Sequence, residues 1–155
     1  MSDPFVTKNI LKWYDLNKRS LPWRKNVSKE KRQYNTLISE FMLQQTQVAT
    51  VIPYFNKFVK EIPNIKKLAS VDNKKLIKLW EGLGYYSRAR NLKKAAQSVI
   101  KNFNGVIPDN FDDLKSLSGI GDYTANAILA IAFNKPYIPL DGNVERIIKR
   151  YLYLK

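Results

Sequence analysis

The sequence has 155 residues, 45% of them hydrophobic and 26% charged, with 27 lysines and arginines against 13 aspartates and glutamates. This length suits one domain, or a large part of a two-lobed one, and the apolar content is sufficient for a core. The formal net charge of +14 favours a polyanionic partner, with nucleic acid ahead of a lipid surface. A solvated basic surface with no such partner is the alternative.

Cysteine and histidine are both absent from the sequence. Their absence excludes disulfides, thiolate nucleophiles, Cys/His zinc sites, iron–sulfur clusters and an imidazole base within these residues. Chemistry must therefore come from carboxylates, lysine, tyrosine or hydroxyl groups, and no metal site built from side chains is predicted.

Nothing in the sequence predicts a membrane protein. No apolar run reaches the ~18 residues that a membrane span needs. The first residues, MSDPFVTKNI, lack the apolar stretch of a signal peptide, so we expect a cytoplasmic protein associated with a bacterial-type nucleoid.

The first predicted helix covers residues 5–17 and follows Pro4. Its apolar positions recur at roughly helical spacing, so the helix needs a partner surface. Residues 19–24, RSLPWR, predict a Pro-interrupted turn in which Trp23 is flanked by cations, and a basic polar loop over 25–32 follows. Trp23 either stacks on a base or covers the core.

The next predicted helix covers residues 34–45, YNTLISEFMLQQ, and contains Glu40 among apolar neighbours. If these neighbours exclude water from the carboxyl group, its pKa rises and the group can act as a general acid at neutral pH. The alternative is a glutamate on the solvent face of the helix.

Thr46 is the expected N-cap of a core helix with a kink at Pro53, and shorter helices are expected near 65–70 and 73–80. In the segment 81–97, two glycines then break the helix before two tyrosines and four cations. Tyrosines of this kind suit stacking on bases, and the cations suit phosphates. A helix C-cap followed by an ordinary charged face is the alternative. The residues concerned are Tyr85, Tyr86, Arg88, Arg90, Lys93 and Lys94.

A helix-hairpin-helix is predicted by a short helix at 110–117, a hairpin with Gly119 and Gly121, and an apolar helix at 123–133. That last helix climbs ~17 Å and the extended piece 136–140 retraces ~17 Å, which returns Asp141 to the hairpin. The glycine N–H groups suit a phosphate, and the carboxylate suits a cationic transition state. Alternatively, the glycines end one helix and Asp141 caps the next.

The final predicted helix covers 143–153 and is expected to turn Val144, Ile147, Ile148 and Tyr151 inward. Strand signals are nearly absent, because 137–140 is too short and is bounded by proline. The predicted fold class is all-α.

Together, these segments resemble the helix-hairpin-helix superfamily of DNA base-excision glycosylases, and most closely its MutY-like adenine glycosylase branch. They cover most of the chain, in the order found in the family. The segments are LPWR (21–24), SEFMLQQTQVATVIPYF (39–55), LWEGLGYYSRARNLKKAA (79–96), LSGIGDYTANAI (117–128) and LDGNVERI (140–147).

The resemblance implies a helix-hairpin-helix DNA glycosylase fold with a six-helix-barrel lobe and an incomplete second lobe. Residues 21–141 would form the barrel lobe, with the helix-hairpin-helix at 111–133. Residues 1–20 would be the N-terminal helix of the second lobe, and residues 142–155 would begin the helix that returns to it. The implied partner is double-stranded DNA, bound by a monomer.

The resemblance also implies the catalytic roles. Glu40 would protonate the adenine base so that it leaves, and Asp141 would stabilise the oxocarbenium-like sugar with support from Asn143. Because the glycosidic bond is inaccessible inside a stacked duplex, the base must first be flipped out. Gln45 and Tyr85 would wedge into the duplex for this purpose. The residues implied to help line the flipped-base pocket are Leu21, Trp23 and Arg24.

Tyr123 separates this chain from bifunctional relatives such as endonuclease III, which carry a lysine at that position. A lysine amine forms a Schiff base and then cuts the strand, whereas a phenol cannot form an imine. We therefore expect a monofunctional glycosylase that leaves an abasic site. Asp122 stands where relatives often have a basic residue or proline, and this change weakens the expected phosphate contact of the hairpin.

The family's four-cysteine iron–sulfur cluster and its C-terminal domain that senses 8-oxoguanine have no counterpart in these residues. We therefore expect no cofactor in this chain, which is either a fragment or a naturally short form. The predicted function is excision of adenine mispaired with 8-oxoguanine or guanine in base-excision repair. The alternatives are a truncated helix-hairpin-helix DNA-binding module with weak or no catalysis, and a glycosylase for another mismatched base.

Overall fold

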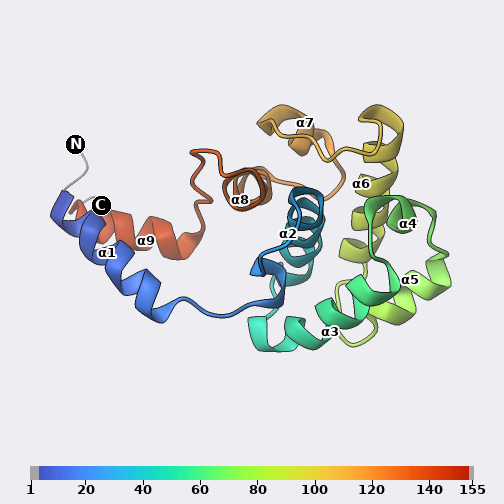
Figure 1. Ribbon diagram of the computed structural model, residues 1–155, viewed down its shortest axis with the longest axis horizontal. Helices are drawn as coiled ribbons and strands as arrows, with labels where there is room; N and C mark the ends of the chain where they lie inside the picture. The colour runs from blue at the N-terminus through green and yellow to red at the C-terminus, as the bar shows by residue number, and fades with distance from the viewer. Residues whose placement is uncertain (1–3, 154–155) are drawn as a thin grey trace.

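The computed structural model describes residues 4–153, and every regular element in this part of the chain is a helix, which confirms the predicted fold class. None of the described helices has the length and apolar character needed to cross a membrane. Figure 1 shows their arrangement. The elements are α1 (Pro4–Asn17), η1 (Pro22–Arg24), α2 (Lys29–Leu43), α3 (Val48–Glu61), α4 (Ile65–Ser70), α5 (Asn73–Trp80), α6 (Ser87–Asn102), α7 (Phe111–Ser116), α8 (Asp122–Phe133) and α9 (Gly142–Tyr151).

Helix α2 lies at the centre of the core and packs against η1, α3, α6 and α8 (Figure 1). All of its residues from 33 to 42 are buried. The core around it contains large aromatic side chains, such as Phe58 and Trp80, whose rings meet edge to face at 6.0 Å. A helix buried on nearly every side can bring a polar residue such as Glu40 into an apolar environment.

Side-chain caps define where several helices begin. The Ser28 side chain accepts a hydrogen bond from the Lys31 backbone N–H at 3.3 Å, so α2 begins at Lys29. The predicted start at residue 34 was too late, because the basic segment before it extends the helix. The predicted Thr46 cap was also wrong. Gln47 is the N-cap of α3, and the Thr46 hydroxyl donates to the Gln44 carbonyl at 3.4 Å.

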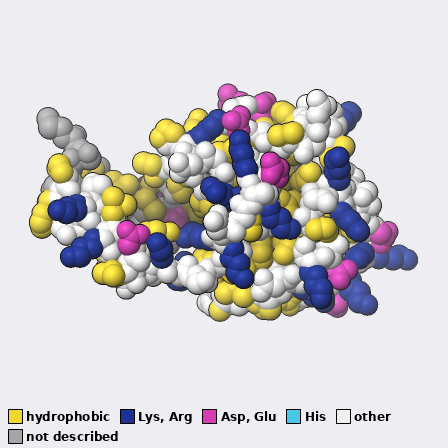
Figure 2. Space-filling model, viewed as in Figure 1, with side chains coloured by type: hydrophobic (Ala, Val, Ile, Leu, Met, Phe, Trp, Pro, Cys, Tyr) yellow, Lys and Arg dark blue, Asp and Glu magenta, His cyan; other side chains and the backbone are white. Residues whose placement is uncertain are grey.

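Helices α1 and α9 lie at one end of the molecule, away from the core (Figure 1). Neither contains a buried residue, and Figure 2 shows hydrophobic side chains gathered over this end. The predicted inward orientation was therefore wrong for Ile147, which is 62% exposed, and for Tyr151, which is 52% exposed, whereas Val144 is half-buried. The helical periodicity of apolar residues identifies an apolar face, but it does not show whether another part of the protein covers that face.

Candidate active site

A cavity of about 820 Å³ opens between the end of α2, the start of α8 and the segment that leads into α9. Glu40, Tyr123 and Asp141 all line it, although they lie far apart in the sequence. The full lining is Arg19, Arg24, Glu40, Leu43, Gln44, Gln45, Tyr85, Ser87, Arg88, Tyr123, Ile131, Pro139, Leu140 and Asp141. Two carboxylates and a phenol therefore share one space.

Glu40 lies in the buried part of α2 and is 8% exposed. Burial raises the pKa of its carboxyl group to about 7, and the positive charge of Arg24 partly opposes this shift. Near neutral pH the group therefore exists in both protonation states. A carboxyl group in this condition can give a proton to a bound molecule.

Tyr123 is in the first turn of α8 and is 43% exposed. Burial raises the pKa of its phenol, and the negative charges of Glu40 and Asp141 raise it further. The hydroxyl group therefore keeps its proton and remains a hydrogen-bond donor beside the two carboxyl groups.

Asp141 is the N-cap of α9, as one of the two sequence interpretations expected. Its Oδ1 accepts hydrogen bonds from the backbone N–H groups of Asn143 at 3.0 Å and Val144 at 2.8 Å. These bonds orient the carboxylate, which also lines the cavity. The Asn143 side chain bonds elsewhere, since its Oδ1 accepts from Arg146 at 3.0 Å. The hydrogen bond from Asn143 to Asp141 comes from the Asn143 backbone N–H.

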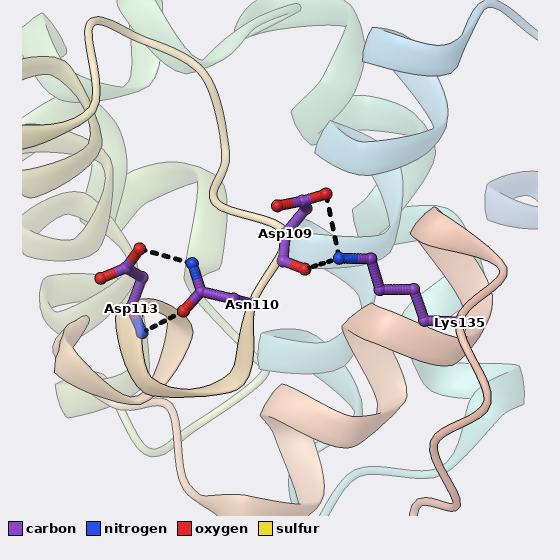
Figure 3. Close-up of polar contacts among 4 residues, drawn as sticks. All are labelled: Asp109, Asn110, Asp113 and Lys135. Atoms are coloured by element: carbon purple, nitrogen blue, oxygen red, sulfur yellow. Dashed lines mark hydrogen bonds and ion pairs between the residues drawn. The ribbon is translucent and has the colours of Figure 1, made fainter.

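The segment from α8 back to Asp141 is anchored at its start. The Lys135 ammonium group donates to the Asp109 backbone carbonyl and pairs with Asp109 Oδ2 at 3.0 Å (Figure 3). The Tyr137 ring stacks on Phe111 with 6.4 Å between centroids. Figure 3 also shows Asn110, which begins α7 as its N-cap. The loop before α7 and the first residue of α7 therefore hold the returning segment on its way to the cavity.

The hairpin before α8 is closely packed at Gly119 and open at Gly121. Gly119 has φ +82°, and a Cβ there would lie 2.8 Å from the Phe41 ring and 2.9 Å from Asn91 Cβ. The Gln44 side chain donates to the Gly119 carbonyl at 3.3 Å. Gly121 is the N-cap of α8, with no atom within 4 Å of where a Cβ would be. Its exposed backbone is therefore accessible to a ligand.

The predicted wedge residues, Gln45 and Tyr85, both have left-handed backbones, with φ 57° and 46°. Both are exposed and line the cavity. Tyr86, the next residue, does not line this cavity. It lines a separate hollow together with Lys78. Left-handed backbones cost free energy in residues other than glycine, and such residues cluster at functional sites.

Three predicted positions differ in the structure. Arg88 is 6% exposed, and its guanidinium group bonds to backbone carbonyls rather than facing solvent with Arg90, so its predicted phosphate contact is wrong. Leu21 and Trp23 are buried in the core, where Trp23 meets Phe55 edge to face at 5.3 Å. Neither side chain lines the cavity. Of the two predictions for Trp23, the one that placed it over the core is the one that the structure supports.

Several lining residues were missed by the sequence reasoning, namely Arg19, Leu43, Gln44, Ser87, Ile131, Pro139 and Leu140. For some of them a signal was present: Arg19 lies in the RSLPWR turn, and Gln44 is next to Gln45. Leu43, Ile131 and Leu140 carry no chemical signal, because an apolar side chain in a cavity wall has the same sequence pattern as one in the core.

The ligands of an iron–sulfur cluster are cysteine thiolates, and these 155 residues include no cysteine. The residues present therefore do not fit such a cluster. Within residues 4–153, no group of three or more His, Cys, Asp or Glu side chains is arranged to hold a metal ion.

Residues 38–155 match the model of the HhH-GPD superfamily base excision DNA repair proteins. The chain is 48% identical over 152 residues to the adenine DNA glycosylase of Buchnera aphidicola subsp. Acyrthosiphon pisum, with 97% of this chain and 42% of that protein covered. It is 44% identical over 147 residues to the human adenine DNA glycosylase, with 92% and 27% covered. The chain thus spans less than half the length of these relatives.

Solved structures agree on the fold. A thermostable thymine-DNA glycosylase superposes with a TM-score of 0.83 and 27% identity, over 94% of this chain and 65% of that one. Endonuclease III in a non-covalent DNA complex superposes with a TM-score of 0.78 and 22% identity, over 100% of this chain and 71% of that one. The chain belongs to the HhH-GPD superfamily of base excision DNA repair proteins.

Proposed function

We propose that this chain carries the catalytic centre of a monofunctional adenine DNA glycosylase that acts on adenine opposite 8-oxoguanine or guanine. The observation that carries the proposal is the pair of carboxyl groups, Glu40 and Asp141, in the wall of one cavity. A volume of about 820 Å³ is in the range of small-molecule sites. The identity to adenine DNA glycosylases supports adenine as the base.

In the proposed reaction, the protonated Glu40 carboxyl group gives its proton to a ring nitrogen of a flipped-out adenine. The bond between the base and the sugar C1′ then breaks, and its electron pair leaves with the base. The sugar becomes oxocarbenium-like, and the Asp141 carboxylate stabilises this positive charge. Water adds to C1′ and gives up one proton to the solvent, from which Glu40 regains its proton, and an abasic site remains.

Tyr123 supports the monofunctional assignment. It lies at the cavity, at the position where bifunctional relatives have the amine that forms a Schiff base. Its phenol can donate a hydrogen bond but cannot form an imine with the sugar. Treatment with borohydride during turnover should therefore trap no covalent complex with the wild-type protein.

The proposal is tested with duplexes that carry adenine opposite 8-oxoguanine or guanine, under single-turnover conditions, followed by alkali. Wild type should give alkali-labile strands, whereas Glu40→Gln and Asp141→Asn should lose at least about 100-fold in rate, because each lacks a group that acts on the reacting bond. Duplex affinity should change little in Glu40→Gln. No cleavage by wild type, even with enzyme in large excess, would reject the proposal.

A DNA-binding module without turnover is the second candidate. It is favoured by the small share of the relatives' length that the chain spans. It would be selected by salt-dependent duplex binding that is equal for wild type and Glu40→Gln, with no abasic product from either.

Excision of another base is a third candidate, because a thymine-DNA glycosylase has the same fold. Thymine and uracil mismatches in the same assay separate this case.

A further inference from the structure

Arg88 is a charged residue that the proposed chemistry does not use, yet it is almost fully buried, with 6% of its surface exposed. Burial of a guanidinium group costs free energy unless its N–H groups find partners. Its Nη1 donates to the carbonyls of Phe41 at 3.2 Å and Met42 at 2.8 Å, and also to that of Gln44. Its Nη2 donates to the carbonyls of Leu83 at 3.2 Å and Gly84 at 3.3 Å.

The two sets of carbonyls belong to different turns. Nη1 binds the C-terminal end of α2, directly before Gln45, and Nη2 binds the turn between α5 and α6, directly before Tyr85. The Arg88 backbone N–H also donates to the Tyr85 carbonyl at 2.9 Å, and its guanidinium group lies 5.6 Å from the centre of the Tyr85 ring. A single side chain thus connects two turns that are 40 residues apart in sequence, because its acceptor Gln44 lies 44 residues before Arg88 and its acceptor Gly84 lies 4 residues before it.

Both turns place an unfavourable backbone at their tips. Gln45 has φ 57° and Tyr85 has φ 46°, and neither is a glycine, so each tip requires support from its surroundings. Both tips are exposed and line the proposed active-site cavity. Two of the carbonyls that Arg88 binds, those of Gln44 and Gly84, lie one residue before a tip, where the bonds can hold the backbone in this conformation.

We propose that Arg88 is a positioning residue, which sets the spacing between the Gln45 and Tyr85 turns so that both tips enter a DNA duplex together at the flipped base. The proposal rests on the proposed function, because it assumes that these tips contact DNA. Arginine suits this role because its planar guanidinium group carries N–H donors that point in two directions. The donors of a lysine ammonium group all lie on one nitrogen atom. Lysine at this position keeps the charge but cannot reach both turns.

The test uses Arg88→Lys, with Arg32→Lys as the control, since Arg32 is an exposed arginine on α2 that does not line the cavity. The first readout is the fluorescence of a 2-aminopurine placed at the target adenine, which rises when the base leaves the stack. The second is the single-turnover excision rate. We expect Arg88→Lys to lose roughly 100-fold in rate, as for groups misplaced by about an ångström, with a matching loss of fluorescence. Affinity for undamaged duplex should change little, because phosphate contacts provide it. Arg32→Lys should behave as wild type.

A double-mutant cycle separates positioning from a general loss of structure. In the Gln45→Ala/Tyr85→Ala background both tips are gone, so Arg88→Lys should add no more than about threefold to the loss, since residues that act together are not additive. A full loss in that background, or no loss in the wild-type background, overturns the proposal. If Arg88→Lys does not fold, Arg88→Gln, which buries no charge, replaces it in the same cycle.

The two readouts also separate this inference from the proposed function. If wild type unstacks 2-aminopurine but excises no base, the fluorescence cycle alone decides the role of Arg88. If excision is normal in every Arg88 variant, the positioning role is rejected while the glycosylase assignment stands.

Discussion

The carboxyl group of Glu40 connects the stability of the protein with its pH dependence. Its pKa is about 7 in the folded protein and 4.5 in the reference state, because burial disfavours the carboxylate. As pH rises, the unfolded chain loses this proton first. The contribution of Glu40 to stability is therefore complete below about pH 4.5 and is lost as pH rises through about 7.

Glu40→Gln removes this ionisation. We expect the free energy of unfolding of the variant to exceed that of wild type by up to roughly 3 kcal/mol at about pH 8, because each pKa unit corresponds to about 1.4 kcal/mol. At about pH 4 the two proteins should differ much less. Urea unfolding at the two pH values measures the difference. A variant that is less stable than wild type at both would contradict the burial of Glu40.

Arg24 provides the second prediction at the residue scale. Its charge lowers the pKa of Glu40, against the larger effect of burial. The excision rate of wild type should fall as pH rises through about 7, because the proton donor is lost. In Arg24→Gln the fall should move to higher pH, whatever the maximum rate. Lys25→Gln, which removes an adjacent cation that does not line the cavity, should leave the profile in place. A profile that moves to lower pH in Arg24→Gln would be inconsistent with this account.

At the scale of the element, the hairpin contrasts two glycines only two residues apart. Gly119→Ala places a Cβ 2.8 Å from the Phe41 ring on a backbone with φ +82°. We expect a loss of about 2–4 kcal/mol in the free energy of unfolding, from backbone strain and overpacking together. Gly121→Ala meets no atom within 4 Å and should cost about 1 kcal/mol or less, the cost of a poorer N-cap. Chemical denaturation of the two variants measures both losses, and equal losses would show that the hairpin packs differently.

Helix α1 is expected to contribute little to the stability of the core. Trp13 is 64% exposed and Leu16 is 78% exposed, so Trp13→Ser and Leu16→Ser should each change the free energy of unfolding by less than about 0.5 kcal/mol. Phe58→Ala, at a fully buried position beside Trp80, should cost about 3–5 kcal/mol. Thermal unfolding compares the three variants. A large loss from either α1 variant would indicate that α1 packs on the rest of the protein in solution.

The whole molecule has a net charge of +14, which predicts salt-dependent binding to duplex DNA. The logarithm of the association constant should fall linearly with the logarithm of salt concentration. Each phosphate that the protein neutralises should make this slope steeper by about 0.9. Arg90 is exposed at the start of α6, and Arg90→Gln should reduce the slope by about one. Arg32→Gln serves as the control, because Arg32 is also an exposed arginine but lies on α2, far from Arg90 in the sequence. An unchanged slope in Arg90→Gln would remove Arg90 from the DNA surface.

Much of the fold could be predicted, because helix formation depends on local periodicity, capping residues and glycine breaks. The helix-hairpin-helix followed from the two glycines between helical segments, and the return to Asp141 followed from segment lengths, because a helix and an extended segment have a known rise per residue. The first residue of α2 was harder to predict, because the polar residues 29–33 suit a loop and the first turn of a helix equally well.

The sequence by itself determined which groups are available for chemistry and the order in which the helices present them. Only the tertiary structure decided which side chains reach the cavity: it buried Arg88 and Trp23 and left the apolar faces of α1 and α9 exposed. A cation or an aromatic ring has the same local pattern whether it faces DNA, carbonyls or the core. The environment of such a side chain is set by packing between segments that are far apart in the chain, and no local pattern contains that information.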